Sequence, residues 1–159
     1  MTPNSPMALA LAEAEAAAAR GEGPVGAVLI DGEGRVLAAA GNRVEADHDP
    51  TAHAEMLVLR AGAARLGARR LAECDLYVTL EPCAMCAGAI VLARLDRVVF
   101  GAWDARAGMG GSVVDLLRHP RLNHRPEVLG GVRAAACGDL LSGFFRARRQ
   151  VVDTPSSTA

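Results

Sequence analysis

The segment Thr79-Leu-Glu-Pro-Cys-Ala-Met-Cys86 places the strongest constraint on how this chain can fold. It overlaps an apolar run, residues 76–80, that has the composition of a buried strand, and its proline suits the start of a helix. Cys83 and Cys86 would then lie in or just before the first helical turn, on one face of that helix. The positive end of the helix dipole favours thiolates there, and two thiolates on one face form half of a tetrahedral zinc site.

A second segment, Asp49-Pro-Thr-Ala-His-Ala-Glu55, can supply the other half of such a site. Its proline suits another helix start, with Asp49 or Thr51 as the cap, so that His53 and Glu55 fall in the first turn. These two residues point to different sides of a helix, because they are only two positions apart. We therefore predict that His53 binds the metal with the two cysteines while Glu55 works beside it. Three protein ligands leave one position of a tetrahedral zinc ion open for water, which is the pattern of catalytic sites.

His-x-Glu followed by Pro-Cys-x-x-Cys is the established signature of zinc-dependent nucleobase deaminases. Each part is ambiguous when it is taken alone. A Cys-x-x-Cys pair also suits a redox centre or two buried thiols, and Glu55 could be an ordinary first-turn glutamate stabilised by the helix dipole. The combination favours zinc.

The pattern of apolar residues around these segments predicts alternating helices and strands. Helices are predicted over residues 7–20, from about Pro50 to residue 66, and over 83–94, 113–119 and 134–149, and strands over 25–30, 35–42, 76–80, 96–101 and 125–130. The glycines of Asp31-Gly-Glu-Gly34 predict a hairpin turn between the first two strands. The third and fourth strands are joined by a whole helix, which predicts a parallel right-handed crossover. We expect an α/β fold, a three-layer α/β/α sandwich with a mixed sheet of about five strands.

The length and composition fit one intracellular domain. We assign residues 1–152 to that domain and expect the Thr/Ser/Pro-rich tail, residues 153–159, to be disordered. The four cysteines do not resemble a small disulfide scaffold, which favours a reducing, cytoplasmic location. Glu13 and Glu15 interrupt the N-terminal apolar run, so we expect no signal peptide. The longest uncharged apolar run, residues 83–93, is too short to span a bilayer.

The charge of the chain is unevenly distributed. The formal net charge is −1, which is not typical of a non-specific nucleic-acid binder. Residues 118–149, however, contain seven arginines against Glu127 and Asp139, a local balance of 7 − 2 = +5. This segment is either a solvated arginine face or an edge that contacts phosphates, and a deaminase site beside it adds weight to the second interpretation.

Taken together, these segments resemble the bacterial tRNA-specific adenosine deaminases, which make inosine at the anticodon wobble position. The resemblance runs from about residue 7 to residue 150 and is carried by residues 50–55, 76–89, 97–101 and 144–145. The zinc signature alone is common to all cytidine-deaminase-like enzymes. Asn123-His-Arg125 and the Phe144-Phe145 pair narrow the resemblance to the tRNA branch.

The resemblance implies a fold, a reaction and a site. The fold is cytidine-deaminase-like, and the reaction is hydrolytic deamination of adenosine by zinc-activated hydroxide attack on C6, with Glu55 as proton shuttle. One Zn²⁺ per subunit would be held by His53, Cys83 and Cys86, with no organic cofactor. Asn42 and the backbone of Ala54 would hold the flipped base, and the anticodon stem-loop would be contacted by Asp104, Asn123, Phe144, Phe145 and Arg148. The family is homodimeric, and both subunits contribute to the RNA surface.

Several of these residues also have plainer interpretations. Asn42 suits the turn at a strand end, and Phe144 and Phe145 suit core packing, so we expect one phenylalanine in the core and one available for stacking. The chain departs from the family pattern at three places. Pro6 stands where an aromatic residue is expected, Trp103 stands where a smaller or polar one is expected, and residues 106–111 match loosely.

Two other functions remain open at this point. The first is deamination of a free nucleobase or nucleoside such as cytosine or guanine, because the same attack serves C4 of cytosine and C6 of adenine. The second is a non-catalytic, zinc-stabilised RNA-binding protein. That alternative predicts a closed metal site with a fourth protein ligand.

Overall fold

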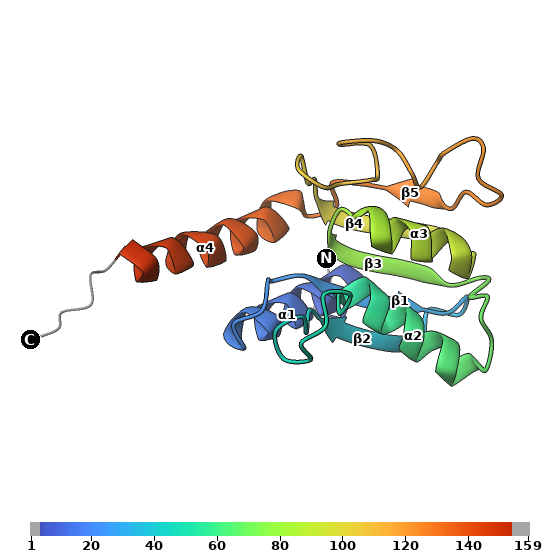
Figure 1. The fold of residues 1–159 in the computed structure, drawn as a ribbon. Coiled ribbons are helices and arrows are strands. Elements are labelled where there is room, and N and C mark those ends of the chain that lie inside the picture. Colours follow the sequence, from blue (N-terminus) through green and yellow to red (C-terminus); the bar gives the residue numbers. More distant parts are fainter. Residues whose placement is uncertain (1–3, 154–159) are drawn as a thin grey trace, which may run out of the picture.

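The computed structural model describes residues 4–153 of the chain. Its elements follow in the order α1 (Pro6–Ala19), β1 (Gly26–Ile30), β2 (Val36–Gly41), α2 (Ala54–Leu66), β3 (Asp75–Leu80), α3 (Ala84–Ala93), β4 (Arg97–Ala102), β5 (Glu127–Leu129) and α4 (Ala134–Asp153) (Figure 1). Apart from Asp153, which ends α4, the predicted disordered tail lies outside the described residues.

The five strands form one mixed sheet in the order β2-β1-β3-β4-β5. β1 is antiparallel to both of its neighbours, whereas β3, β4 and β5 are parallel to one another. The predicted parallel crossover through α3 is therefore confirmed. As a consequence of this topology, the carboxyl ends of β2, β3, β4 and β5 all lie at the same end of the sheet, which is where ligands bind in open α/β sheets.

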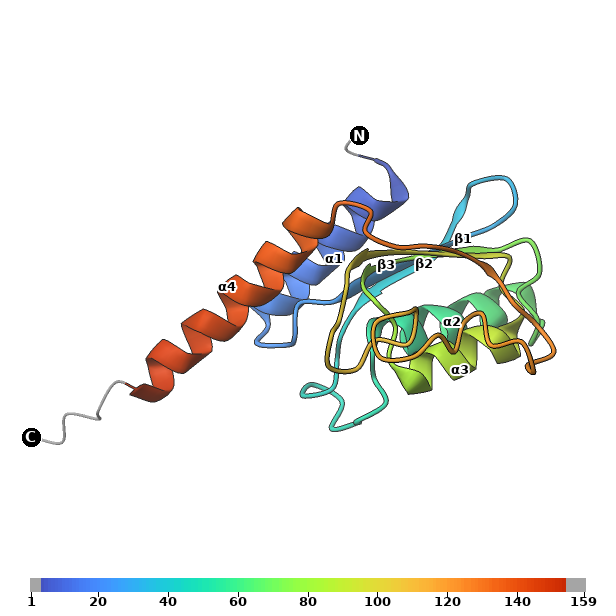
Figure 2. The ribbon, with the colours of Figure 1, turned by 90° about the horizontal axis from the view of Figure 1, so that it is seen from above.

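Helices cover both faces of the sheet, as predicted. Figure 2 shows α2 and α3 together on one face and α1 and α4 on the other. Successive strand residues contribute to opposite cores because side chains alternate along a strand. Leu29 and Val98 pack on the side of α2 and α3, and Val28 and Val99 pack on the side of α1 and α4. The far part of α4 extends beyond the sheet in both views (Figures 1 and 2).

The predicted helix over residues 113–119 is wrong. This segment is a loop that contains an isolated β-bridge between Gly110 and Asp115. Its backbone N–H groups find partners in the preceding loop: Val113 donates to the Gly108 carbonyl over 2.9 Å and Leu116 to the Met109 carbonyl over 2.9 Å. These bonds replace the helical ladder that the local pattern favoured.

The other element boundaries differ from the predicted ones by a few residues. α4 continues to Asp153, four residues beyond its predicted end, and β5 is limited to Glu127–Leu129. No helix among residues 4–153 combines the length and apolar character needed to cross a membrane.

Candidate active site

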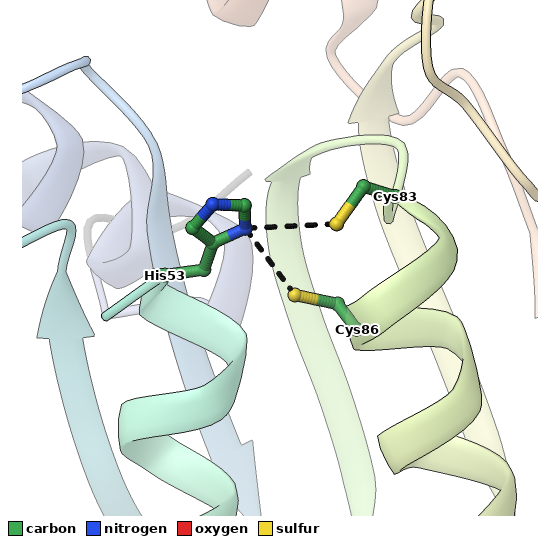
Figure 3. A group of neighbouring side chains, drawn as sticks. All are labelled: His53, Cys83 and Cys86. Atoms are coloured by element: carbon green, nitrogen blue, oxygen red, sulfur yellow. Dashed lines mark hydrogen bonds between the residues drawn. The ribbon is translucent and has the colours of Figure 1, made fainter. Parts of the chain in front are cut away.

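His53 lies directly before α2 and is its N-cap, with φ −74° and ψ 150°. The prediction that His53 falls inside the first helical turn is therefore wrong. Asp49 and Thr51 form their own turn upstream, in which the Asp49 carboxylate accepts hydrogen bonds from the backbone N–H and the hydroxyl of Thr51 over 2.8 and 2.7 Å. The extended backbone at His53 directs its ring away from the helix axis and towards α3 (Figure 3).

The two cysteines lie at the start of α3, as the motif predicts. Cys83 is the extended N-cap of this helix, and Cys86 is buried in its first turn. Because α2 and α3 pack against each other on the same face of the sheet, their N-termini bring all three side chains together. Figure 3 shows the histidine ring facing both sulfur atoms.

The three side chains fit a zinc ion. The His53 Nδ1 atom lies 3.6 Å from the Cys83 sulfur and 3.5 Å from the Cys86 sulfur, and all three candidate ligand atoms lie within 4.8 Å of one another. A tetrahedral zinc ion with Zn–S bonds of about 2.3 Å and Zn–N bonds of about 2.0 Å holds its sulfur and nitrogen ligands about 3.5 Å apart. Among the described residues, this is the group of three with metal-binding geometry, and it contains no fourth protein ligand.

The thiols have strongly shifted acidities because they interact with each other and with His53. Hydrogen bonds from Cys86 and from the His53 ring lower the pKa of Cys83 to about 3. The neighbouring Cys83 in turn raises the pKa of Cys86 far above its ordinary value. A divalent cation binds cysteine as the thiolate, so the lowered pKa of Cys83 suits it to metal binding.

Glu55 lies in the first turn of α2, next to the ligand set. Its exposed fraction is 4%, and burial raises its pKa above the ordinary value. The carboxyl also interacts with the Cys86 thiol, which places it beside the metal ligands. A buried carboxyl in this position is suited to proton transfer next to a metal.

The chain is similar to known proteins in sequence and in fold. The family model of the cytidine and deoxycytidylate deaminase zinc-binding region matches residues 2–102. The tRNA-specific adenosine deaminase of Bacillus subtilis is 49% identical to the chain over 131 residues, which cover 82% of this chain and 81% of that protein. The chain belongs to the family of tRNA-specific adenosine deaminases. This is a family of zinc-dependent hydrolases with the cytidine deaminase domain.

Solved structures show the same fold. A structure from work on A-to-I editing by tRNA:A34 deaminases at the wobble position of transfer RNA matches with a TM-score of 0.82 and 46% identity, covering 86% of this chain and 98% of that one. A guanine deaminase from Nitrosomonas europaea matches with a TM-score of 0.75 and 27% identity, covering 90% of this chain and 84% of that one. The cytidine-deaminase-like fold predicted from the sequence is confirmed.

In this member of the tRNA-specific adenosine deaminase family, a cavity of about 1130 Å³ opens at the carboxyl ends of β2 and β4. It brings together four of the predicted substrate residues, Asn42, Asp104, Phe145 and Arg148. Their roles in substrate binding stay predictions. Arg148 also donates a hydrogen bond to the Gly21 carbonyl over 3.0 Å, which connects α4 to the turn after α1.

The remaining predicted substrate residues lie elsewhere or are already bonded. The backbone N–H of Ala54 donates to the Asn42 side-chain oxygen over 2.8 Å. Phe144 is half-buried beneath the Arg148 guanidinium, 4.8 Å from the ring centroid, and half of Phe145 is exposed. Asn123 is exposed in a loop whose carbonyl accepts from Arg94, at the opposite end of α3 from Cys83. A single chain therefore does not bring Asn123 to the metal ligands.

Glu81 organises the loop after β4, and sequence reasoning missed this role. Its exposed fraction is 2%. Its carboxylate accepts hydrogen bonds from the backbone N–H groups of Asp104, Gly110 and Ser112 over 2.9, 2.8 and 3.1 Å, and from the Ser112 hydroxyl. Although burial opposes ionisation, these bonds lower the pKa of Glu81 below its ordinary value. The sequence did offer a signal for this role, because Glu81 is an acidic residue directly after the buried strand β3.

Glu22 has a similar role in the loop before His53. It is buried, and its carboxylate accepts from the backbone N–H groups of Glu45 and Ala46 over 3.2 and 2.8 Å. The two loops that border the site are thus each held by one buried carboxylate.

Proposed function

We propose that the chain catalyses the hydrolytic deamination of adenosine to inosine at the wobble position of a tRNA anticodon. The observation that carries the proposal is the convergence of one nitrogen and two sulfur ligands beside the buried carboxyl of Glu55. The substrate is suggested by the relatives, since the Bacillus subtilis protein is a tRNA-specific adenosine deaminase and covers most of the chain.

The chemistry follows from the residues at the site. His53, Cys83 and Cys86 would hold one Zn²⁺ per subunit, and when bound the ion supplies the Lewis acidity that lets a water molecule ionise near neutral pH. Glu55 accepts a proton from that water and delivers it to N1 of adenine while the water oxygen bonds to C6. It then transfers the second proton to the amino group as the C6–N6 bond breaks. Adenosine and water become inosine and ammonia.

The cavity beside the ligand set supplies groups suited to an anticodon loop. Asn42 lines it and also contacts Ala54, the residue between His53 and Glu55. Its side-chain amide N–H₂ is available to a base that enters the site, because the amide oxygen is used by the backbone of Ala54. Arg148 offers a charge to phosphate groups, and the exposed ring of Phe145 offers a stacking surface.

We propose that the enzyme is a homodimer that uses the outer face of α3 as its interface. Residues 84–93 contain no charged side chain. Leu92 on this helix is 80% exposed, and Met85, Gly88 and Ala89 are partly exposed at helical spacing on the same side. An uncharged helix face of this kind is typical of a surface that another chain covers. Replacing Leu92 with Glu should shift the protein from dimer to monomer in analytical ultracentrifugation, and an unchanged dimer would place the interface elsewhere.

We further propose that residues 1–152 form one folding unit that works in the cytoplasm. Both cores are built on one sheet. The four cysteines are free thiols, which fits a reducing compartment.

The test is inosine formation in an anticodon stem-loop RNA with adenosine at the wobble position. Zinc-loaded protein should form inosine, and protein refolded with a chelator should not. Replacing Glu55 with Ala should keep zinc and fold while slowing turnover by about 100-fold or more. Consumption of guanine or cytosine in place of RNA would identify a free-base deaminase. No turnover of any of these by folded, zinc-loaded protein would favour the non-catalytic alternative.

A further inference from the structure

Trp103 is the single tryptophan of the chain, and it is both rigidly held and half exposed. It follows directly after β4, and its exposed fraction is 52%. Its ring forms a T-shaped pair with that of Phe100, which is fully buried, with ring centroids 4.8 Å apart and planes at 89°. The backbone of Gly130 lies against the indole, because a Cβ atom there would be 2.8 Å from the ring. An aromatic ring fixed on two sides and open on another offers a ready-made surface.

The open side of Trp103 lines the same cavity as Asn42 and Phe145. Four arginines and one acid, Asp104, belong to the lining, so the formal charge of the cavity wall is 4 − 1 = +3. The Asp104 carboxylate accepts hydrogen bonds from the backbone N–H groups of Arg106 and Ala107 over 3.0 and 3.3 Å, which engages it in its own loop. The cavity therefore combines aromatic surfaces with positive charge, the combination that single-stranded nucleic acid requires.

Trp103 is displaced from the metal ligands by one strand. Cys83 comes after the end of β3, and Trp103 after the end of the neighbouring strand β4. Asn42 lies directly after β2 and is bonded to Ala54, between His53 and Glu55, so a base held by Asn42 lies beside the ligand set. A base against Trp103 is therefore a different nucleotide of the same strand.

We propose that Trp103 is the stacking platform for a nucleobase next to the target adenosine. The inference rests on the proposed function, since it concerns the same RNA substrate. A fixed indole stacks on any base without loss of side-chain freedom, and contacts to nucleotides beside a flipped base set the sequence context that a deaminase accepts. Trp103 is thus a specificity-determining residue of this chain.

The single tryptophan allows a direct test in the intact protein. The zinc-loaded Glu55→Ala variant is titrated with the anticodon stem-loop, and indole emission is recorded beside the anisotropy of labelled RNA. Stacking should quench the emission as RNA binds. The titration is then repeated with RNAs that carry one abasic site at each loop position. The quenching should disappear for one position beside the target adenosine and persist for the others.

Two outcomes of this titration would overturn the proposal. One is RNA binding with unchanged indole emission, or with equal quenching by every abasic RNA. The other is an emission change that follows protein concentration in the absence of RNA, which would mean that a second copy of the chain covers Trp103. Deamination by the wild-type enzyme is measured in parallel. If the wild-type enzyme forms inosine while RNA binding leaves the indole emission unchanged, only the role proposed for Trp103 is wrong, and the proposed function stands.

Substitutions give a second readout. Trp103→Ala should weaken RNA binding by about 5- to 150-fold. Trp103→Phe keeps an aromatic ring and should weaken RNA binding less. On the RNA that lacks the stacked base, Trp103→Ala should cause no further loss, because the two changes remove the same contact. Leu66→Ala is the matched control: Leu66 is 45% exposed and lines a separate cavity at the other end of the sheet. An equal loss for Trp103→Ala on the intact and abasic RNAs would assign the residue a structural role. Circular dichroism and zinc content verify the fold of each variant.

Discussion

The side-chain oxygen of Asn42 accepts a hydrogen bond from the backbone N–H of Ala54 over 2.8 Å. This bond connects the end of β2 to the first residue of α2 and satisfies an N–H group that the helix itself leaves free. Because Ala54 lies between His53 and Glu55, the bond positions both the metal ligand and the proposed proton shuttle. Asn42 thus has a structural role in addition to the predicted contact with the base.

Two substitutions at Asn42 separate these roles. Asn42→Asp keeps the acceptor for Ala54 but loses the amide N–H₂, so thermal stability should be retained while kcat/KM for the stem-loop falls about 10-fold or more. Asn42→Ala loses both groups and should also lower the free energy of unfolding by about 1 kcal/mol. Equal kcat/KM for the Asp variant and the wild type would show that the amide N–H₂ does not bind the base.

Glu81 and its loop give the second prediction. Glu81→Gln turns an acceptor-only carboxylate into a group with an N–H₂ donor facing backbone N–H donors, so the free energy of unfolding should fall by about 2–3 kcal/mol. Gly108 leaves no room for adjustment, because a Cβ atom there would lie 2.3 Å from the Glu81 carboxyl. Hydrogen exchange should accelerate over residues 104–112.

The control for this substitution is Glu127→Gln, at an exposed carboxylate that pairs with Arg97 over 3.1 Å. This substitution should change the free energy of unfolding by close to zero, as is usual for surface ion pairs. If hydrogen exchange over residues 104–112 is the same in the Glu81→Gln variant as in the wild type, the Glu81 carboxylate does not hold this loop.

The sequence was sufficient for the features that depend on neighbouring residues. The strand before Cys83, its place at the start of a helix and the hairpin after β1 follow from short-range patterns of apolar residues, proline and glycine. The alternation of helices and strands also predicted the layers correctly. The spacing of Cys83 and Cys86 placed both sulfur atoms on one side of α3, as Figure 3 confirms.

The remaining features depend on contacts between distant parts of the chain. The start of α2 is set by Asn42, twelve positions before Ala54, so local capping preferences at Asp49 and Thr51 were misleading. The loop in place of the predicted helix over residues 113–119 is held in part by Glu81, 31 positions before Ser112. The position of Asn123 is likewise set by a bond to Arg94. The local sequence of these three segments does not indicate that Asn42, Glu81 or Arg94 is the bonding partner.

The far end of the sheet provides a pH-dependent prediction. Burial raises the pKa of Asp75, and the nearby carboxylates of Asp96 and Glu127 add to the effect against the opposing charge of Arg97, 3.9 Å away. A raised pKa in the folded state means that ionisation of Asp75 costs stability as the pH rises above about 4. Asp75→Asn should therefore raise the melting temperature at pH 7 and have little effect at pH 3. A larger rise in melting temperature at pH 3 than at pH 7 would contradict the prediction.

The metal centre gives the sharpest prediction, because the chain contains a matched cysteine outside it. Cys86→Ala should abolish stoichiometric zinc binding and inosine formation, since two ligands remain where three are needed. Cys74→Ala removes an equally buried thiol at the start of β3, at the far end of the sheet from the ligands. That variant should keep one zinc ion per subunit and full activity, at a cost of about 1 kcal/mol in stability from the lost packing. Zinc is measured by plasma mass spectrometry on dialysed protein. Loss of zinc from both variants would point to a general effect on folding, whereas full zinc occupancy in the Cys86→Ala variant would remove Cys86 from the ligand set.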